Sequence, residues 1–146
     1  DYIGCVDDTC LATGELLPVK DTPFDFNKRK RIGQDLEADH IQLKNAFGYD
    51  HSFVLNDTEN QLTLEEPVSG RRLVISTTAP VVQVYTGNFL KDGCIGKAGR
   101  VYENREGVAL ETQLMPNAIN TEENPSTILR KGDKFESNTK YVFEIM

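Results

Sequence analysis

The residue with the clearest chemical potential in this sequence is Glu111, in the middle of a predicted strand. The segment 107–116 opens with glycine, closes with proline, and can be divided between two faces by alternation. Glu111 shares one face with Ala109, Gln113 and Met115. Such small and apolar neighbours would leave a carboxylate poorly solvated, a setting that suits a general base. A solvent-facing glutamate on a half-exposed strand is the other interpretation that this segment leaves open.

A second set of polar side chains occurs in the predicted strand 81–86. Period-two alternation puts Gln83 and Tyr85 on one face, with Val82 and Val84 on the other. An amide and a phenol beside a carboxylate are suited to a polyol, because they bind hydroxyls and cover C–H faces. The alternative is that Gln83 and Tyr85 form the solvent face of the strand.

The segment 48–53 places an aspartate and a histidine side by side after a glycine. Neighbours in a strand point to opposite faces, so Asp50 and His51 should not share one site. Asp50 is then either a hydroxyl-binding carboxylate or a turn cap. For His51, a hydrogen-bonded structural role is favoured over a catalytic one. We expect His40 to be exposed. The sequence contains no catalytic triad and no metal-ligand cluster.

Length and charge limit the function classes. The chain has 146 residues, enough for one domain or a piece of something larger. Its composition, with 38% hydrophobic and 27% charged residues, is typical of a globular protein. A net charge of −7 gives no electrostatic case for nucleic acid or an anionic membrane as partner, and no apolar run is long enough to cross a bilayer. Cys5, Cys10 and Cys94 are odd in number and lack metal spacing, which predicts reduced intracellular thiols.

The elements that would position these residues are mostly short strands. A helix is expected only at Asp35–Lys44, where the periodicity is weak, and the segment 9–26 should form short strands and turns around Gly14, Pro18 and Pro23. Many short strands separated by turns predict a β-sandwich or barrel. Strands are predicted at Tyr49–Leu55, Gln61–Glu66, Arg71–Thr78, Val81–Thr86, the Glu111 segment and Thr139–Ile145, and loops at Asn88–Arg100 and Asn117–Pro125.

Taken in order along the chain, these residues resemble the C-terminal part of the galactose mutarotase (aldose 1-epimerase) family. No single phrase is specific, but their number and order make the resemblance strong, and it covers nearly the whole chain. The phrases are Thr13–Glu15, Thr22–Phe26, Gly48–Leu55, Pro67–Arg71, Thr77–Thr78, Val82–Leu90, Leu110–Gln113, Pro116–Ala118 and Pro125–Arg130.

The resemblance implies a fold, an activity and roles for four residues. The family folds as a large antiparallel β-sandwich of the galactose mutarotase-like (supersandwich) type and interconverts hexose anomers without metal or cofactor. The glutamate of its Leu-Glu-Thr-Gln phrase is the catalytic base, which makes Glu111 the base here. Asp50 and Gln83 fall on sugar-binding positions of the family, and Tyr85 falls where the family has an aromatic residue near the sugar.

The sequence also departs from the family pattern. Members of the family are more than twice as long as this chain. Their N-terminal half contains the residues for the acid part of the reaction, an arginine and two histidines. We therefore expect residues 1–146 to be the C-terminal part of an epimerase domain, acting on an aldose with an N-terminal half in the same or a separate chain. The family's location predicts the cytoplasm. A non-catalytic sugar-binding or sensor protein on the same fold, and a hexose-phosphate epimerase relative, are the alternatives.

Overall fold

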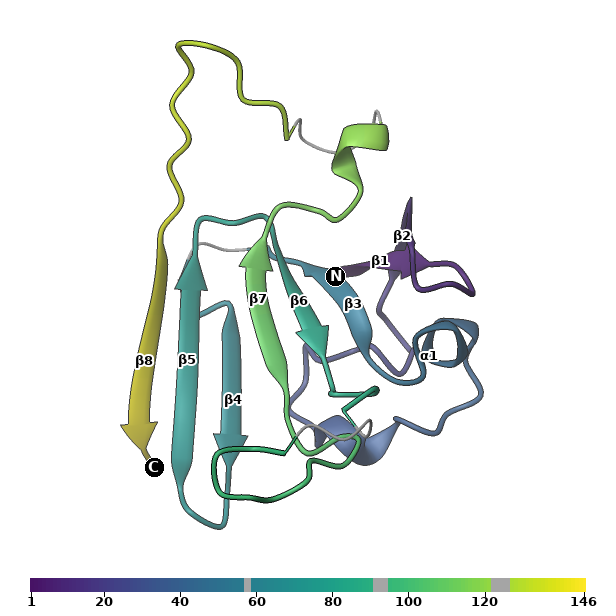
Figure 1. Ribbon diagram of the computed structural model, residues 1–146, viewed down its shortest axis with the longest axis vertical. Coiled ribbons are helices and arrows are strands. Elements are labelled where there is room, and N and C mark those ends of the chain that lie inside the picture. Colours follow the sequence, from purple (N-terminus) through teal and green to yellow (C-terminus); the bar gives the residue numbers. More distant parts are fainter. Residues whose placement is uncertain (57–58, 91–94, 122–126) are drawn as a thin grey trace.

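A computed structural model describes residues 1–56, 59–90, 95–121 and 127–146, so that Cys94 lies outside the described residues (Figure 1). Strands dominate, and among the described residues no helix is long and apolar enough to cross a membrane. The strands are β1 (Tyr2–Val6), β2 (Ala12–Pro18), β3 (Asp50–Val54), β4 (Leu62–Glu66), β5 (Arg71–Thr77), β6 (Val81–Tyr85), β7 (Ala109–Gln113) and β8 (Thr139–Ile145). The helices are η1 (Ile32–Gln34), α1 (Ile41–Ala46) and η2 (Ala118–Asn120).

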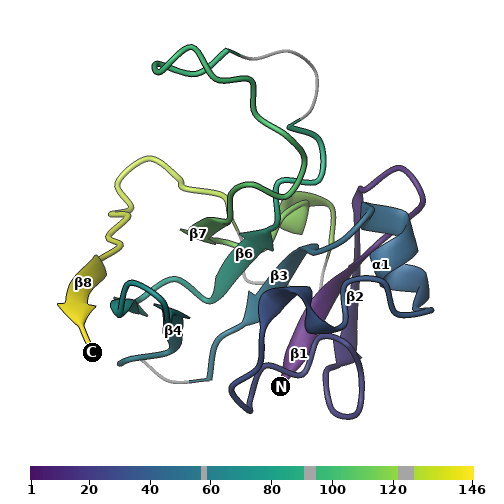
Figure 2. The same cartoon turned by 90° about the horizontal axis from the view of Figure 1, so that it is seen from below.

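The strands form two antiparallel sheets that lie beside each other. The larger has the order β2-β1-β3-β6-β7, and the smaller has the order β4-β5-β8. Figures 1 and 2 place β8 at one end of the molecule and α1 at the other. The expectation of an all-β antiparallel fold is confirmed.

Threonine side chains join the two sheets. The Oγ1 atom of Thr112 on β7 lies 2.9 Å from Oγ1 of Thr139 on β8, which lies 2.8 Å from Oγ1 of Thr77 on β5. Thr77 is only 3% exposed and the other two threonines are half-buried, so these hydroxyls satisfy one another at a partly buried contact. The contact fixes β7, the predicted base strand, against the smaller sheet.

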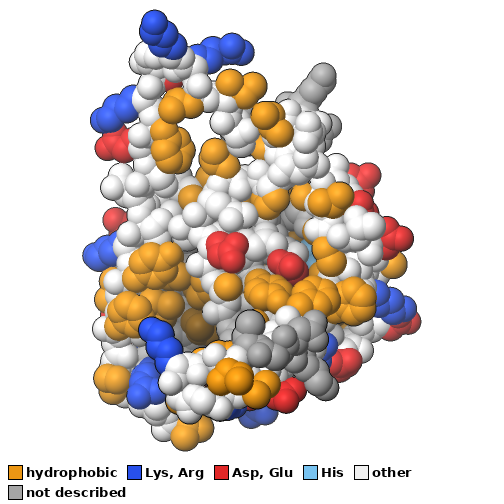
Figure 3. Space-filling model, viewed as in Figure 1, with side chains coloured by type: hydrophobic (Ala, Val, Ile, Leu, Met, Phe, Trp, Pro, Cys, Tyr) orange, Lys and Arg blue, Asp and Glu red, His pale blue; other side chains and the backbone are white. Residues whose placement is uncertain are grey.

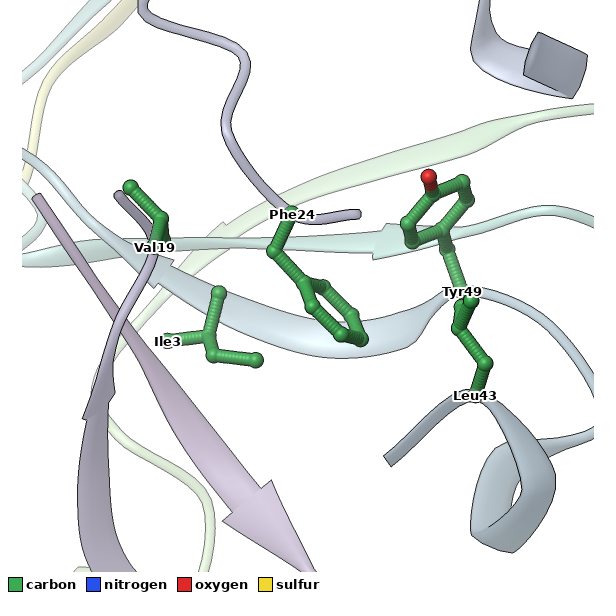
Figure 4. Packing of buried hydrophobic residues seen from close by; sticks show 5 residues of the cluster. All are labelled: Ile3, Val19, Phe24, Leu43 and Tyr49. Atoms are coloured by element: carbon green, nitrogen blue, oxygen red, sulfur yellow. The ribbon is translucent and has the colours of Figure 1, made fainter. Parts of the chain in front are cut away.

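The main core lies between the larger sheet and the segments around α1 (Figure 4). Aromatic rings dominate it: the ring centroid of Phe24 lies 5.4 Å from that of Tyr49 and 4.7 Å from that of His51, in edge-to-face geometry. Tyr49 also donates a 2.8 Å hydrogen bond from its hydroxyl to the carbonyl of Pro23. The buried cluster consists of Ile3, Val19, Phe24, Leu43 and Tyr49.

The predicted strands are confirmed with small changes at their ends, and one strand was not predicted. Four of the five residues of β1 are buried, so the segment lacks the polar alternation by which a half-exposed strand is recognised. The predicted strand 107–116 is shorter in the structure, Ala109–Gln113.

The predicted helix Asp35–Lys44 is wrong in its extent. The imidazole of His40 accepts a 3.2 Å hydrogen bond at Nδ1 from the backbone N–H of Gln42, which caps α1 so that the helix begins at Ile41. Phe47 ends it in the left-handed region, at φ 56°. His40 is therefore half-buried at a helix terminus, and the expectation that it is exposed is wrong.

His51 is a buried structural histidine, as the sequence favoured. Its Nδ1 accepts a 3.1 Å hydrogen bond from the backbone N–H of Asp50, and its Nε2 lies 3.2 Å from Oε1 of Gln42. Burial, with a smaller effect of His40, lowers the pKa of His51 to about 4. The ring faces the core, while Asp50 faces the other side of β3.

We predict that the free energy of unfolding falls as pH is lowered from about 6.5 to about 4. Unfolding lets His51 bind a proton over this window, because its pKa is about 4 in the fold and about 6.5 when solvated. One pKa unit is worth about 1.4 kcal/mol, so the loss approaches about 3 kcal/mol. Urea unfolding at several pH values should show this slope, and His51→Gln should flatten it. An equal slope in both proteins would contradict the assignment.

The smaller sheet exposes hydrophobic side chains along β8. Tyr141, Phe143 and Ile145 alternate on one face of this edge strand and are 47%, 80% and 76% exposed. Leu73 lies opposite Phe143 on the neighbouring strand and extends the patch. Figure 3 shows hydrophobic side chains gathered over β5 and β8. We call these four residues the β8 apolar face; an edge strand with such a face is prone to association.

We predict that the isolated chain associates through the β8 apolar face. Phe143→Ser should shift sedimentation velocity profiles toward the monomer, because it removes the most exposed aromatic side chain of that face. Phe135→Ser is the matched control, since Phe135 is 63% exposed but lies outside the strands. A clean monomer for the unchanged chain would refute the prediction.

Candidate functional site

The register of the larger sheet brings the predicted site residues to one face. Gln83 on β6 is paired with Ser52 on β3 and with Glu111 on β7, so three polar side chains form a row across adjacent strands. In the next row, Asp50 is paired with Tyr85. Directly paired residues of antiparallel strands share a face, so all four predicted residues lie together with Ser52. Acidic side chains lie over β6 and β7 near the centre of the view in Figure 3.

Gln83 is the centre of a hydrogen-bonded group on this face. Its Nε2 donates a 2.7 Å hydrogen bond to Oδ1 of Asp50, and its Oε1 accepts one from the hydroxyl of Ser52. All three side chains are at least partly buried. The bonds fix the orientation of the amide and hold one oxygen of Asp50, while the other carboxylate oxygen remains available to a ligand.

The expected environment of Glu111 is not formed by the described residues. The side chain is exposed, so the prediction of a poorly solvated carboxylate is wrong for this chain. The reason lies in the sheet order: β7 is an edge strand, so only β6 flanks Glu111 within the larger sheet. Glu111 still places a carboxylate beside Gln83, because the two residues are paired across β7 and β6.

Tyr85 lies in the same row as Asp50, at the end of β6, where the following loop begins. Its hydroxyl oxygen accepts a 3.0 Å hydrogen bond from the backbone N–H of Phe89. The half-buried ring is thereby fixed beside Asp50, its partner across the strands. The structure thus holds an aromatic ring at the edge of the polar group.

The position of Asp50 depends on a buried turn. Nδ2 of Asn88 donates hydrogen bonds of 2.9 and 3.0 Å to the carbonyls of Ala46 and Tyr49, and its Oδ1 accepts one of 2.8 Å from Thr86. Gly48, at φ 141°, lies against this amide, and a Cβ there would be 2.4 Å from Oδ1 of Asn88. The glycine is therefore required where the chain enters β3.

The segment after β7 closes the other end of the face. Met115 packs with Val81 and Ala118, while Nδ2 of Asn117 donates a 2.8 Å hydrogen bond to the carbonyl of Ala12 on β2. The segment therefore runs from β7, at one edge of the sheet, to β2, at the other. It forms a wall beside the Ser52–Gln83–Glu111 row.

Neither described histidine lies on this face. His51 lies in the core on the opposite side of β3, and His40 caps α1. Among the described residues, no group of three His, Cys, Asp or Glu side chains could hold a metal ion. The chemistry available on the face is that of carboxylates, an amide, a hydroxyl and a phenol.

Sequence reasoning missed Ser52 and the wall formed by Met115. Ser52 lies two residues after Asp50 in a predicted strand, so period-two alternation could have placed both on one face. Met115 was placed on the face of Glu111, but its role depends on a chain reversal that no local pattern encodes.

Comparisons with known proteins identify relatives of this chain. A family model described as "Aldose 1-epimerase" matches residues 1–142. Galactose mutarotase from Sus scrofa is 38% identical over 143 residues, which are 96% of this chain and 40% of the relative. Aldose 1-epimerase from Haemophilus influenzae is 34% identical over 99% of this chain and 43% of its own length.

Solved structures give the same result. A GalM/aldose epimerase homologue from C. elegans superposes with a TM-score of 0.83 at 31% identity, covering 99% of this chain and 43% of that one. Galactose 1-epimerase from Lactobacillus acidophilus gives 0.74 at 29% identity, covering 99% and 42%. The expected fold type is confirmed, and the chain spans about two fifths of the length of the relatives it matches.

We predict that Gln83→Glu destabilises the fold near neutral pH. The substitution replaces the amide donor beside Asp50 with a second carboxylate, which repels it and leaves its oxygen without the hydrogen bond. The free energy of unfolding should fall by about 1–3 kcal/mol at pH 7 and by less in acid, because protonation of the introduced carboxyl removes the repulsion and restores a donor. Gln113→Glu, on the same face of β7, is the matched control for urea unfolding. A loss that does not depend on pH would contradict the electrostatic account.

Proposed function

Because the chain belongs to the aldose 1-epimerase family, as its sequence phrases predicted, we propose that residues 1–146 are the C-terminal part of an epimerase domain. That domain interconverts the α and β anomers of hexoses such as galactose and glucose. The observation that carries the proposal is the placement of Asp50, Gln83 and Glu111 on one face of three adjacent strands. This is the arrangement needed for holding a ring beside a base.

Asp50 and Gln83 hold the sugar in this proposal. Each already uses part of its hydrogen-bonding capacity on the other, which fixes their geometry before a ligand arrives. The remaining carboxylate oxygen of Asp50 accepts a hydrogen bond from a ring hydroxyl, and the ring of Tyr85 covers a C–H face. Holding the sugar ring in a fixed orientation accounts for a large share of catalysis, because the proton to be removed must lie close to the base.

Glu111 is the general base. It removes the proton from the anomeric hydroxyl while the ring oxygen receives a proton from an acid on the opposite side of the ring. The C1–O5 bond breaks, giving the open-chain aldehyde, and C1 turns about the C1–C2 bond. Reversal of the proton transfers closes the ring with the other configuration at C1. Base and acid each contribute about 10²–10⁴-fold.

The acid and the desolvation of Glu111 come from the N-terminal part of the domain. The relatives are about two and a half times as long as this chain, which leaves ample polypeptide for that role. The β8 apolar face, with Phe143 80% exposed, offers it a large hydrophobic contact surface. The same contact would place new side chains near β7, because Thr112 and Thr139 join that strand to β8.

We also propose the cytoplasm as the location. Cys5 is buried and Cys10 is half-buried, and both thiols are free in the structure. Free thiols are typical of a reducing compartment.

We predict that this chain alone does not accelerate mutarotation, and that adding the N-terminal part of the domain restores the reaction. Polarimetry of fresh α-D-galactose measures the rate directly. In the completed domain, Glu111→Gln should lower turnover by about 10²–10⁴-fold with a modest loss of sugar binding, because it removes the base and keeps a polar side chain.

Glu15→Gln is the matched control, since Glu15 is an exposed glutamate on β2 of the same sheet. An unchanged rate in the Glu111→Gln variant would remove Glu111 from the mechanism. Sugar binding without any acceleration by the completed domain would favour a non-catalytic sugar-binding protein on this fold. Acceleration by the chain alone would mean that an acid lies within residues 1–146.

A further inference from the structure

Strand β8 leaves one edge of the smaller sheet open. It is the last strand in the order β4-β5-β8, and Figures 1 and 2 show no other described segment beyond it. An open edge presents unpaired backbone N–H and C=O groups, which can pair with a further strand. The edge differs from the β8 apolar face, because the face consists of side chains that project from the sheet and the edge consists of backbone groups.

Alternate residues of β8 direct their backbone groups to this open edge. The backbone N–H of Met146 donates a 2.8 Å hydrogen bond to the carbonyl of Gly70, and that of Thr78 donates a 2.9 Å bond to the carbonyl of Asn138. These bonds flank the β5–β8 ladder at its two ends, so the even-numbered residues of β8 bond to β5. The N–H and C=O groups of the odd-numbered residues therefore point to the open edge.

We propose that this edge pairs with β8 of a second copy of the chain. The two β8 strands run antiparallel about a two-fold axis at Val142, so the smaller sheets of both copies join into one continuous sheet. The inference is independent of the proposed function, because no residue of the candidate site takes part. It concerns the edge of β8, whereas the proposed function uses its apolar face.

The charged residues of β8 are complementary to each other in this register. With Val142 opposite Val142 of the second copy, Lys140 lies opposite Glu144, and the two-fold axis forms this pair twice. Both side chains are exposed. Nε of Arg72 already lies 3.6 Å from Oε2 of Glu144, so Lys140 of the second copy would extend an existing ion pair on the same face of the sheet.

The apolar residues of β8 are complementary in the same register. Tyr141 lies opposite Phe143 of the second copy, and Thr139 lies opposite Ile145. All four are odd-numbered residues, so their free N–H and C=O groups meet those of the second copy and can form hydrogen-bonded pairs. Tyr141 and Phe143 are exposed in the single chain, and an aromatic cross-strand pair covers part of both rings.

The neighbouring two-fold registers lack this complementarity. An axis between two residues would place odd-numbered residues opposite even-numbered ones, which leaves the free backbone groups unmatched. An axis at Tyr141 would place Lys140 opposite Val142. An axis at Phe143 would place Glu144 opposite Val142. Only the axis at Val142 gives each charged side chain of β8 a partner of opposite charge.

Two charge reversals test this register by sedimentation velocity. Lys140→Glu places two carboxylates opposite each other and should weaken dimerisation about tenfold, because the two-fold axis repeats the repulsion. Glu144→Lys places two ammonium groups opposite each other and should weaken it by a similar factor. A one-to-one mixture of the two variants should dimerise about as tightly as the unchanged chain, because the mixed dimer regains both pairs of opposite charge.

Lys131→Glu is the matched control for these reversals. It changes the net charge equally, at an exposed position outside the strands, and should alter dimerisation less than twofold. A mixture of the two β8 variants that stays monomeric would overturn the register. A monomeric unchanged chain would overturn the pairing itself. Loss of the dimer when the N-terminal part of the domain is added would assign the edge to that part and would also overturn the proposal.

A cysteine at the axis gives a test that does not depend on charge. Val142 would face its own copy as a non-hydrogen-bonded pair, with Cα atoms about 4.5 Å apart, a distance that a disulfide spans. Val142→Cys should therefore form a covalent dimer in oxidised glutathione. The unchanged chain, treated in parallel, gives the contribution of its native cysteines.

Thr63→Cys is the matched control for the cysteine at the axis. Thr63 pairs with Val74, which pairs with Val142, so all three lie in one row on the same face of the sheet. Thr63 is exposed on β4, the opposite edge strand. Its cysteine variant should form at least tenfold less covalent dimer than Val142→Cys. Equal amounts from both variants would overturn the pairing of β8 with β8.

Discussion

The antiparallel register of β3, β6 and β7 is the constraint on which the candidate site depends. It pairs Gln83 with Ser52 on one side and with Glu111 on the other, so residues about 30 positions apart in the chain become neighbours. A shift of β6 by one residue would turn Gln83 toward the core and bring Val82 or Val84 to the site face. The buried faces of β3 and β6, which carry His51 and Val82, oppose such a shift.

One strand, β3, serves the core and the site together. His51 packs against Phe24 on one side, while Asp50 and Ser52 bond to Gln83 on the other. The two functions are coupled through the backbone, because the N–H of Asp50 donates to the imidazole of His51. Core packing therefore contributes to the position of the carboxylate that we propose to hold the sugar.

The two sides of the chain differ in how completely they are packed. The end near α1 is closed by an aromatic core, whereas β7 and β8 leave Glu111 and the β8 apolar face exposed. These exposed features lie beside each other, since Thr112 and Thr139 bond across the two sheets. In the function that we propose, both features are contact sites for the N-terminal part of the domain.

Sequence alone determined the class of fold and most strands, and it predicted the residue types of the candidate site. Alternation in 81–86 predicted that Gln83 and Tyr85 face one side of the strand and the valines between and before them the other. Asp50 and His51 were predicted on opposite faces because they are neighbours. Both predictions succeed because the direction of a side chain in a strand depends only on its position along that strand. The tertiary structure decided the other features. These are the strand pairing, the hydrogen bond from Gln83 to Asp50, the role of Ser52, the capping of α1 by His40 and the exposure of Glu111. These features depend on which distant segments of the chain come into contact. A local sequence pattern reveals the periodicity of one element and does not show which other element it will pack against.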